Sequence, residues 1–492
     1  MTTCVAWAQF GPSPAPSSGP QAAQLPLSGR AGQSGSVVVN QTPVPGVTTS
    51  VNTLSTNIQV QGPYTGSVSR GDLAGGKLSL AEAIKRALTY NLGGVGANNL
   101  VRQAAGQARV ARSGLLPNVS ASLTENVQQT NLAAFGIRIP FGPTVVGPFN
   151  YFDLRARLNQ TVFDFTTLNN YRASKATSEA ARQSAQDARD LVVFAASGAY
   201  LQVIAAQSRV AAAQAQIDTA SASLTQMQQQ RQVGVVAQID VNRSQVELQT
   251  QQQRLVSLQN DLAKQKFNLA RIVGLGPGVP FELADDVPFS PAPDLSVDQA
   301  MTQALANRAD LKAAEAQIKA AQAARSAARS ERLPSLSFSA DYGVIGKNPS
   351  DSHGTVTVAG SLRIPIYQGG RTEGSIAQAD AALDQRRAEL EDLKGRIETD
   401  LRSAFLDLES ARSQVEVARN NQQLARETLR LTRERFEAGI TTTVEVVQAQ
   451  QAVSGADLDY ITSVFAHNVA KVNVARSIGR AEENVPRFLG KP

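Results

Sequence analysis

The segment ARSGLLPNVS (111–120) returns as ARSERLPSLS (328–337), and in each copy a helix-forming stretch passes through Leu-Pro into alternating sequence. Two further pairs repeat in the same order: LSLAEAI (78–84) with LSVDQAM (295–301), and GVVAQIDV (234–241) with GITTTVEV (439–446). Three matches in one order indicate a duplicated unit of about two hundred residues. Both halves must therefore satisfy one architecture.

Apolar and polar residues alternate after each Leu-Pro pair. In the second copy, 335–344 and 355–364 place apolar residues or glycine at every second position, with mostly Ser, Thr, Asp and Arg between them. In the first copy, 119–123 and 152–158 do the same, and Arg155 and Arg157 take polar positions. A period of two predicts β-strands with one apolar and one polar face.

These strands suit two interpretations. A membrane β-barrel strand turns its apolar face to lipid and its polar face to water, and a half-buried hairpin of a soluble protein alternates in the same way. No run approaches eighteen apolar residues, so we expect no transmembrane helix. The first copy has a longer segment between its strands, and Ala133–Asn150, with its Gly, Pro and Phe, predicts an external loop there.

The long stretches that follow the strands contain no proline between Pro148 and Pro277, or between Pro365 and Pro486. Proline breaks helices, so both stretches are predicted to be helical. From Ile397 to Phe436, apolar residues recur in alternating steps of four and three, which is the heptad pattern of a coiled coil. A helix over 371–436 would be about 100 Å long at 1.5 Å per residue. Each helix is expected to reverse at a glycine, Gly234 in the first copy and Gly439 in the second.

Composition excludes several kinds of site. The chain has one Cys and two His, which argues against a disulfide framework, a cysteine metal cluster or a histidine-based triad, and we expect no cofactor or metal. We find no phosphate loop and no nucleophile–base pair, so the chain is not expected to be an enzyme. The net charge of +6 is small for 492 residues. It favours basic residues dispersed on solvated helices over a nucleic-acid surface.

The sequence divides into five parts. Residues 1–76 are expected to hold the remnant of an export signal, with Ala6-Trp7-Ala8 as a cleavage-like site, and then a disordered tail rich in Pro, Gly, Ser and Gln. Thr3 is a poor residue to precede a lipidated Cys4. The first repeat covers 77–275, a linker 276–294, the second repeat 295–480 and a C-terminal tail 481–492.

The duplication, the strand pairs, the Leu-Pro entries and the glycine turns resemble the TolC family of outer-membrane efflux proteins, over about residues 78–480. The resemblance implies a mainly α fold with a β-barrel part, long coiled-coil hairpins and four strands per chain. Three chains would close a 12-stranded barrel in the outer membrane above a periplasmic α-helical tunnel. The linker 276–294 would lie at the waist of that tunnel.

The resemblance also implies a function. The trimer would conduct substrates passively to the cell exterior, in efflux or type I secretion, after transfer from an inner-membrane transporter of the resistance-nodulation-division or ATP-binding-cassette type and a periplasmic adaptor. Matching the family's second turn makes Glu445 and Gln448 the candidate aperture-lining residues. Gly234, Asp240, Gly439 and Thr441 are the candidate hairpin-turn residues.

Physical reasoning leaves some of these assignments open. Three symmetry-related carboxylates at Glu445 would repel one another and attract cations. An acidic residue in the first turn of a helix is also favoured simply by the helix dipole, and this accounts equally for Asp240. Thr441 is uncharged, which puts in doubt the basic latch that other members carry there. The alternative for the whole chain is a soluble periplasmic coiled-coil scaffold or adaptor, although the duplicated strand pairs argue against it.

Overall fold

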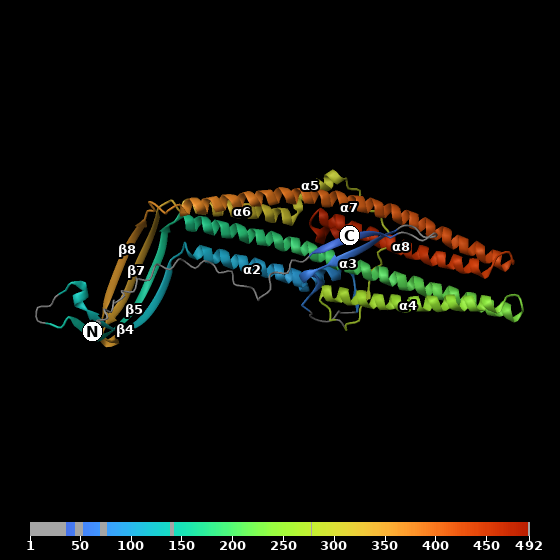
Figure 1. Cartoon of the computed structure of the whole chain (residues 1–492), viewed down its shortest axis with the longest axis horizontal. Coiled ribbons are helices and arrows are strands. Elements are labelled where there is room, and N and C mark those ends of the chain that lie inside the picture. The colour runs from blue at the N-terminus through green and yellow to red at the C-terminus, as the bar shows by residue number, and fades with distance from the viewer. Residues whose placement is uncertain (1–35, 45–52, 69–75, 138–141, 277, 491–492) are drawn as a thin grey trace, which may run out of the picture. The chain divides into compact units, whose positions relative to one another are not determined.

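The computed structural model describes residues 36–44, 53–68, 76–137, 142–276 and 278–490. The predicted cleavage-like site and Cys4 lie outside these residues. The two repeats contain the same elements in the same order (Figure 1). The first is α1 (Leu80–Tyr90), α2 (Leu92–Ser113), β4 (Asn118–Asn131), β5 (Val145–Phe163), α3 (Phe165–Gln232) and α4 (Gln238–Val273). The second is α5 (Val297–Asn307), α6 (Ala309–Ser330), β7 (Ser335–Gly346), β8 (Ser352–Arg363), α7 (Arg371–Glu437) and α8 (Thr443–Ser477).

The helix-forming stretch that begins each repeat is divided into two helices. Asn91 has extended backbone angles and separates α1 from α2, and Arg308 does the same between α5 and α6. Asn91 is fully buried; its Oδ1 accepts the N–H of Gly93, and its Nδ2 donates to the carbonyl of Tyr64 at 2.8 Å. The break is stabilised because the amide side chain caps the second helix and is also held by another segment.

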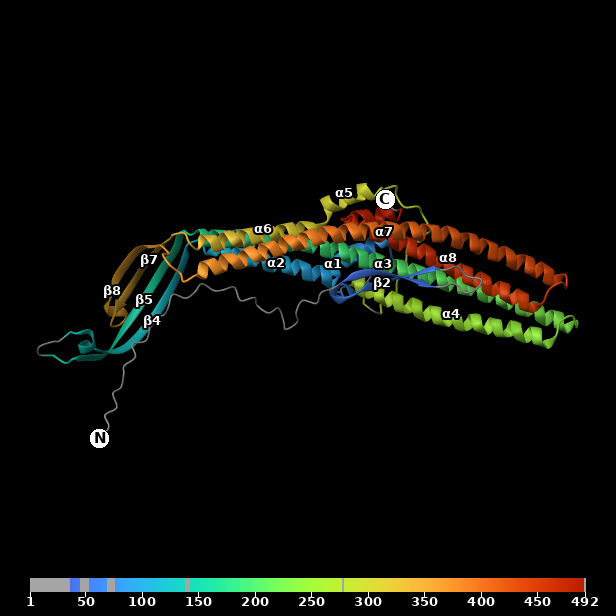
Figure 2. The ribbon, with the colours of Figure 1, turned by 45° about the horizontal axis from the view of Figure 1, so that its top comes forward.

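The long helices form two hairpins. α3 packs beside α4, and α7 packs beside α8, as both views show (Figures 1 and 2). Among the predicted heptad positions of α7, Ile397, Leu401, Ala404, Ala411 and Val415 are buried, and others such as Leu408 and Phe436 are half-buried. Small alanines at this seam let the helices approach closely over many turns.

The main hydrophobic core lies where the middle of α3 meets the other helices. Phe194, Tyr200 and Leu201 of α3 are at most 2% exposed, and they pack in one cluster with residues of α1, α4, α5, α7 and α8. The sequence predicted no helix that could cross a membrane. However, α3 contains an 18-residue window of mean hydropathy 1.5, which is long and apolar enough to do so. Since 72% of that window is buried within the chain, the core accounts for its composition.

The four strands of the repeats form one antiparallel sheet in the order β4-β5-β7-β8. Strands from the two repeats therefore meet at the β5–β7 pair. Short strands β3 (Lys77–Leu78) and β6 (Glu282–Leu283) pair in parallel and join the start of the first repeat to the linker.

Part of the predicted disordered tail is ordered, and the prediction is wrong for those residues. β1 (Val37–Val44) and β2 (Thr53–Val60) form an antiparallel ribbon. Val37 and Ile58 are buried in the main core, and the ribbon contacts α3 and α8. At Gly198 of α3 an added Cβ would clash with Ile58 Cδ1, so the absence of a side chain there allows Ile58 of the ribbon to pack against α3. Burial of these alternating apolar residues offsets the entropy that ordering costs.

The C-terminal segment is also ordered, where a tail was expected. α9 (Ala481–Phe488) buries Val485 and Phe488 against the main core. The carboxylate of Asp190 on α3 accepts the Ala481 N–H at the start of this helix, at 3.0 Å. Arg189 forms an ion pair with Glu482 beside it. An amphipathic helix of two turns with a charged anchor at its N-terminus docks as part of the fold.

Candidate functional site

The four-stranded sheet presents one continuous apolar face. Val119 of β4, Leu158 of β5, Ala340 of β7 and Val358 of β8 lie in register across it. Val119 is 71% exposed and Val358 64% exposed, although both are apolar. A wide exposed apolar face is unusual on a soluble monomer and marks a surface that something apolar covers.

The other face of the sheet carries charges that pair with one another. Arg155 of β5 forms ion pairs with Asp341 of β7 and, at 3.3 Å, with Asp153 of its own strand. Its guanidinium also approaches the Thr355 hydroxyl of β8. The side chains of Arg155, Asp153 and Asp341 are about a fifth exposed. The sequence marked Arg155 as a polar position, but the strand pairing that gives it partners from both repeats was not predicted.

The tips of the two hairpins have the same backbone hydrogen bonds. After α3, the N–H of Val235 donates to the Gln230 carbonyl at 2.8 Å, and after α7, the N–H of Ile440 donates to the Arg435 carbonyl at 2.9 Å. Gly234 and Gly439 have φ of +79° and +73°, which favours glycine at these two positions. The candidate turn glycines thus lie at equivalent places in the two hairpins.

The acidic residues that follow the turns differ in their partners. Asp240 lies in the first turn of α4 and forms an ion pair with Arg243 at 3.4 Å, within the same helix. Glu445 lies in the first turn of α8 and is exposed, and the position matching Arg243 is Gln448, also exposed. Among the described residues the Glu445 carboxylate has no ion pair or hydrogen bond.

Glu445 and Gln448 lie on one side of α8, away from its packed side. Val446, Ala449 and Val453 on α8 are buried, and the last two pack against Leu429 of α7. The two exposed residues are one helical turn apart, so they present a polar strip away from the coiled-coil seam. Thr441 precedes α8 and is half-buried, and its hydroxyl is buried with no hydrogen-bond partner among the described residues.

Polar contacts join the two hairpins within the chain, and none was predicted. Asp457 of α8 accepts hydrogen bonds from Gln216 of α3 at 3.1 Å and from Gln422 and Arg426 of α7, each at 2.8 Å. Its side chain is 11% exposed.

A second set of contacts lies between α4 and α8. The buried Glu247 of α4 accepts hydrogen bonds from Gln251 and from Gln451 of α8. Arg254 donates to the Ser454 hydroxyl at 2.9 Å. Buried carboxylates that accept several hydrogen bonds hold helices in one register. The abundance of Gln in these helices was the available signal, but it did not reveal which residues pair.

Comparison with known proteins agrees with this architecture. The family model described as "Outer membrane efflux protein" matches residues 96–275 and 300–480, one match in each repeat. The chain is 25% identical over 338 residues to the outer membrane efflux protein BepC of Brucella suis biovar 1 (strain 1330), which covers 66% of this chain and 71% of BepC.

Solved structures show the same fold. A membrane protein from Pseudomonas aeruginosa superposes with a TM-score of 0.73 at 18% identity, covering 85% of this chain and 92% of that one. The outer membrane channel CmeC of Campylobacter jejuni gives a TM-score of 0.71 at 18% identity, covering 84% and 89%.

The chain belongs to the outer membrane efflux protein family, and the resemblance to TolC-type channels predicted from the repeats is confirmed. It is an outer-membrane channel for export, and the soluble scaffold considered above is not favoured. The family is one of transport proteins rather than enzymes.

Proposed function

We propose that three copies of the chain assemble into one passive conduit, with a 12-stranded barrel in the outer membrane and a helical tunnel in the periplasm. The sheet carries this proposal. Its apolar face is exposed, and among the described residues its edge strands β4 and β8 each have one strand neighbour. An open edge in lipid leaves backbone groups unpaired at a cost of several kcal/mol each. Joining β8 of one copy to β4 of the next removes both edges.

The polar face would then line the barrel lumen. The ion-paired side chains Arg155, Asp153 and Asp341 would lie in water inside the barrel. There the charges would remain hydrated, so their desolvation penalty would be small. The exposed valines and leucines would face lipid, following the alternation of barrel strands.

The hairpins would continue the conduit as the tunnel wall. Each chain contributes two long hairpins, so three chains would give a wall with approximate sixfold symmetry. The linker 276–294 would lie around the outside of the tunnel at its waist. The cross-hairpin contacts of Asp457 and Glu247 would hold the two hairpins of each chain together and favour the closed tip.

The tip would form the aperture. In a trimer, three copies of Glu445 would face one lumen with no basic neighbour to neutralise them, and Gln448 would line the next turn. Asp240 is paired with Arg243, which makes it the weaker candidate. A ring of carboxylates attracts cations and repels itself when ionised, so it would affect both selectivity and opening.

Substrate would come from an inner-membrane transporter through a periplasmic adaptor, and the partner would supply the energy. The tips offer apolar side chains for adaptor docking, since Val235 is 71% exposed and Ile440 68% exposed. The transporter would be of the resistance-nodulation-division or ATP-binding-cassette type.

The test is to express the full chain with an export signal, separate the membranes and reconstitute the purified protein in planar bilayers. We expect the protein in the outer-membrane fraction, a cross-linked species of three chains, and discrete conductance steps. Recovery in the soluble periplasmic fraction, or a monomer without conductance, would overturn the proposal.

A further inference from the structure

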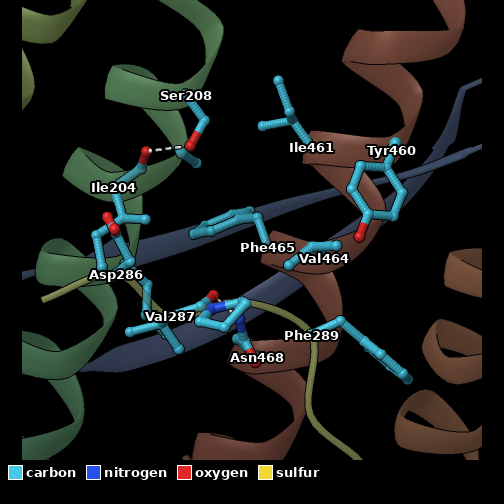
Figure 3. A pocket seen from close by; sticks show the side chains of 13 residues that line it. Ile204, Ser208, Asp286, Val287, Phe289, Tyr460, Ile461, Val464, Phe465 and Asn468 are labelled. Carbon is cyan, nitrogen blue, oxygen red and sulfur yellow. Dashed lines mark hydrogen bonds between the residues drawn. The ribbon is translucent and has the colours of Figure 1, made fainter. Parts of the chain in front are cut away.

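A cavity of about 270 Å³ opens between the two hairpins and the linker (Figure 3). One wall is α3, with Leu201 and Ile204, and the facing wall is α8, with Ile461 and Phe465. Val287 of the linker closes a third side. Its volume is just below the range of about 300–1,000 Å³ that is typical of drug-sized ligand sites.

The charge at this cavity is of one sign. Asp286 is the only charged residue among those that line it, and it lies exposed at the rim. In the described part of the chain its carboxylate has no ion pair or hydrogen bond. Most of the other lining residues are apolar, and the rings of Tyr460 and Phe465 are among them, while the Phe289 ring packs against His467. A carboxylate beside aromatic faces is the surrounding that an organic cation prefers.

Three uncharged polar side chains, those of Ser208, Tyr460 and Asn468, also line the cavity. Asn468 is 2% exposed, and its Nδ2 donates to the Val287 carbonyl at 3.1 Å, while its Oδ1 is buried with no partner in the part of the chain that the structure describes. The Ser208 hydroxyl is already used, because it donates to the Ile204 carbonyl. Among the described residues the Tyr460 hydroxyl has no hydrogen bond, so it can accept or donate one.

We infer that this cavity binds a small amphiphilic cation, an aromatic or aliphatic body bearing a protonated amine, with the amine at Asp286 and the apolar body between α3 and α8. None of the residues that line the site belongs to the hairpin tips or to the four-stranded sheet. Its walls come from both hairpins and the linker, so a bound cation would join these three segments and stabilise the folded chain.

The test uses the purified full chain in detergent and calorimetric titration with tryptamine. Two matched probes keep the indole and change only the charge: 3-ethylindole is neutral and indole-3-propionate is anionic. We expect tryptamine to bind with a Kd of about 1 mM or tighter. The neutral probe should bind at least about fivefold more weakly and the anion not at all, and added salt should weaken tryptamine binding.

Two variants locate the site. Asp286→Asn should weaken tryptamine about fivefold, the range for an exposed charge pair, and leave 3-ethylindole unchanged. Asp294→Asn, in the same linker but outside the cavity, is the matched control and should match the parent protein. Ile461→Trp should fill the cavity and abolish binding of both indoles, while thermal melting followed by circular dichroism checks that the variant is folded.

The inference is overturned if tryptamine and 3-ethylindole bind equally, or if Asp286→Asn and Asp294→Asn behave alike. Unchanged binding to Ile461→Trp would also overturn it. Binding and conductance are measured separately. If the parent protein conducts normally but does not bind tryptamine, this site alone is contradicted. Loss of conductance with normal binding would contradict the proposed conduit alone.

Discussion

Asp457 on α8 accepts a hydrogen bond from Gln216 on α3 at 3.1 Å, although the two residues are 241 positions apart. The same carboxylate accepts hydrogen bonds from Gln422 and Arg426 on α7. One buried group therefore ties the first hairpin to the second, and each hairpin comes from a different copy of the duplicated unit.

Removing this carboxylate should loosen the two hairpins. We expect Asp457→Ala to lower the free energy of unfolding by about 1–3 kcal/mol, because it leaves several donors unsatisfied. In a planar bilayer the variant should spend more time at high conductance, since the hairpins separate more easily. Arg426→Ala is the control: its side chain is 60% exposed and Asp457 keeps both glutamine donors, so the loss should be at most about 1 kcal/mol. Equal effects of the two variants would contradict a role for the buried carboxylate.

The apolar and polar faces of the sheet should respond oppositely to a charge. We expect Val358→Arg to cost about 2–4 kcal/mol if the residue lies near the bilayer midplane, and to reduce the protein recovered in the outer membrane. Thr357→Arg, one residue earlier on the polar face, should be recovered normally and change only conductance. The measurement is quantitative blotting of separated membranes. Similar losses from both substitutions would argue against a lipid-facing apolar side.

Local patterns in the sequence predicted much of this fold. Periods of two and of seven located the strands and the long helices, because each pattern repeats within a few residues and reflects one buried face. The glycines at 234 and 439 predicted the reversals, since their positive φ is a local requirement. The sequence resemblance then suggested the proposed assembly, which no single chain displays.

What was missed depends on contacts between distant segments. The break at Asn91 is held by the carbonyls of Tyr64 and Ile272, and the ribbon residue Ile58 packs where Gly198 lacks a side chain. The hydrogen bond between Gln216 and Asp457 belongs to the same class. Composition alone marked residues 37–60 as a tail, because the alternating valines and isoleucine are few and the surface that buries them lies far along the sequence.

Docking of α9 should depend on pH through Asp190. Burial raises the pKa of Asp190 to about 6, and the nearby Asp187 carboxylate adds to the rise, while the N–H of Ala481 and the Arg476 guanidinium oppose it. The unfolded value is 3.8, so the folded chain binds the proton more tightly. The resulting stabilisation is fully present below about pH 4 and is lost as the pH rises to about 6, and it amounts to at most about 3 kcal/mol.

Replacing Asp190 should weaken the dependence of the unfolding free energy on pH. Asp190→Asn keeps an oxygen that accepts the Ala481 N–H but cannot ionise, so the unfolding free energy should fall less between pH 4 and 7 than in the parent protein. A residual slope is expected, because burial also raises the pKa of Asp187. Glu482→Gln, at the exposed ion pair with Arg189, serves as the control and should keep the full slope. If Asp190→Asn keeps the parent slope, another group controls the pH dependence.

The difference between the two hairpin tips gives a prediction about ion selectivity. Asp240 is paired with Arg243, and the matching pair in the second repeat is Glu445 and Gln448, in which the acid has no ion pair among the described residues. We expect Glu445→Gln to lower the cation-to-anion permeability ratio about threefold at low salt, where screening is weak. Asp240→Asn should leave the ratio nearly unchanged, because that charge is already balanced. The measurement is the reversal potential in a salt gradient across a planar bilayer.

Two changes at Gln448 separate aperture lining from a simple helix-start role for Glu445. Gln448→Arg reproduces the pair of the first repeat, so it should reduce cation preference as Glu445→Gln does while Glu445 itself stays in place. Gln448→Glu adds a second carboxylate one turn along and should raise the preference. If Glu445 only complements the dipole at the start of α8, neither Gln448 variant moves the reversal potential, and Glu445→Gln costs only about 0.3–1 kcal/mol of stability. Opposite shifts from the two Gln448 variants require both side chains to face the permeating ions, because a charge on the outer surface of the tunnel would be screened from them by solvent and protein.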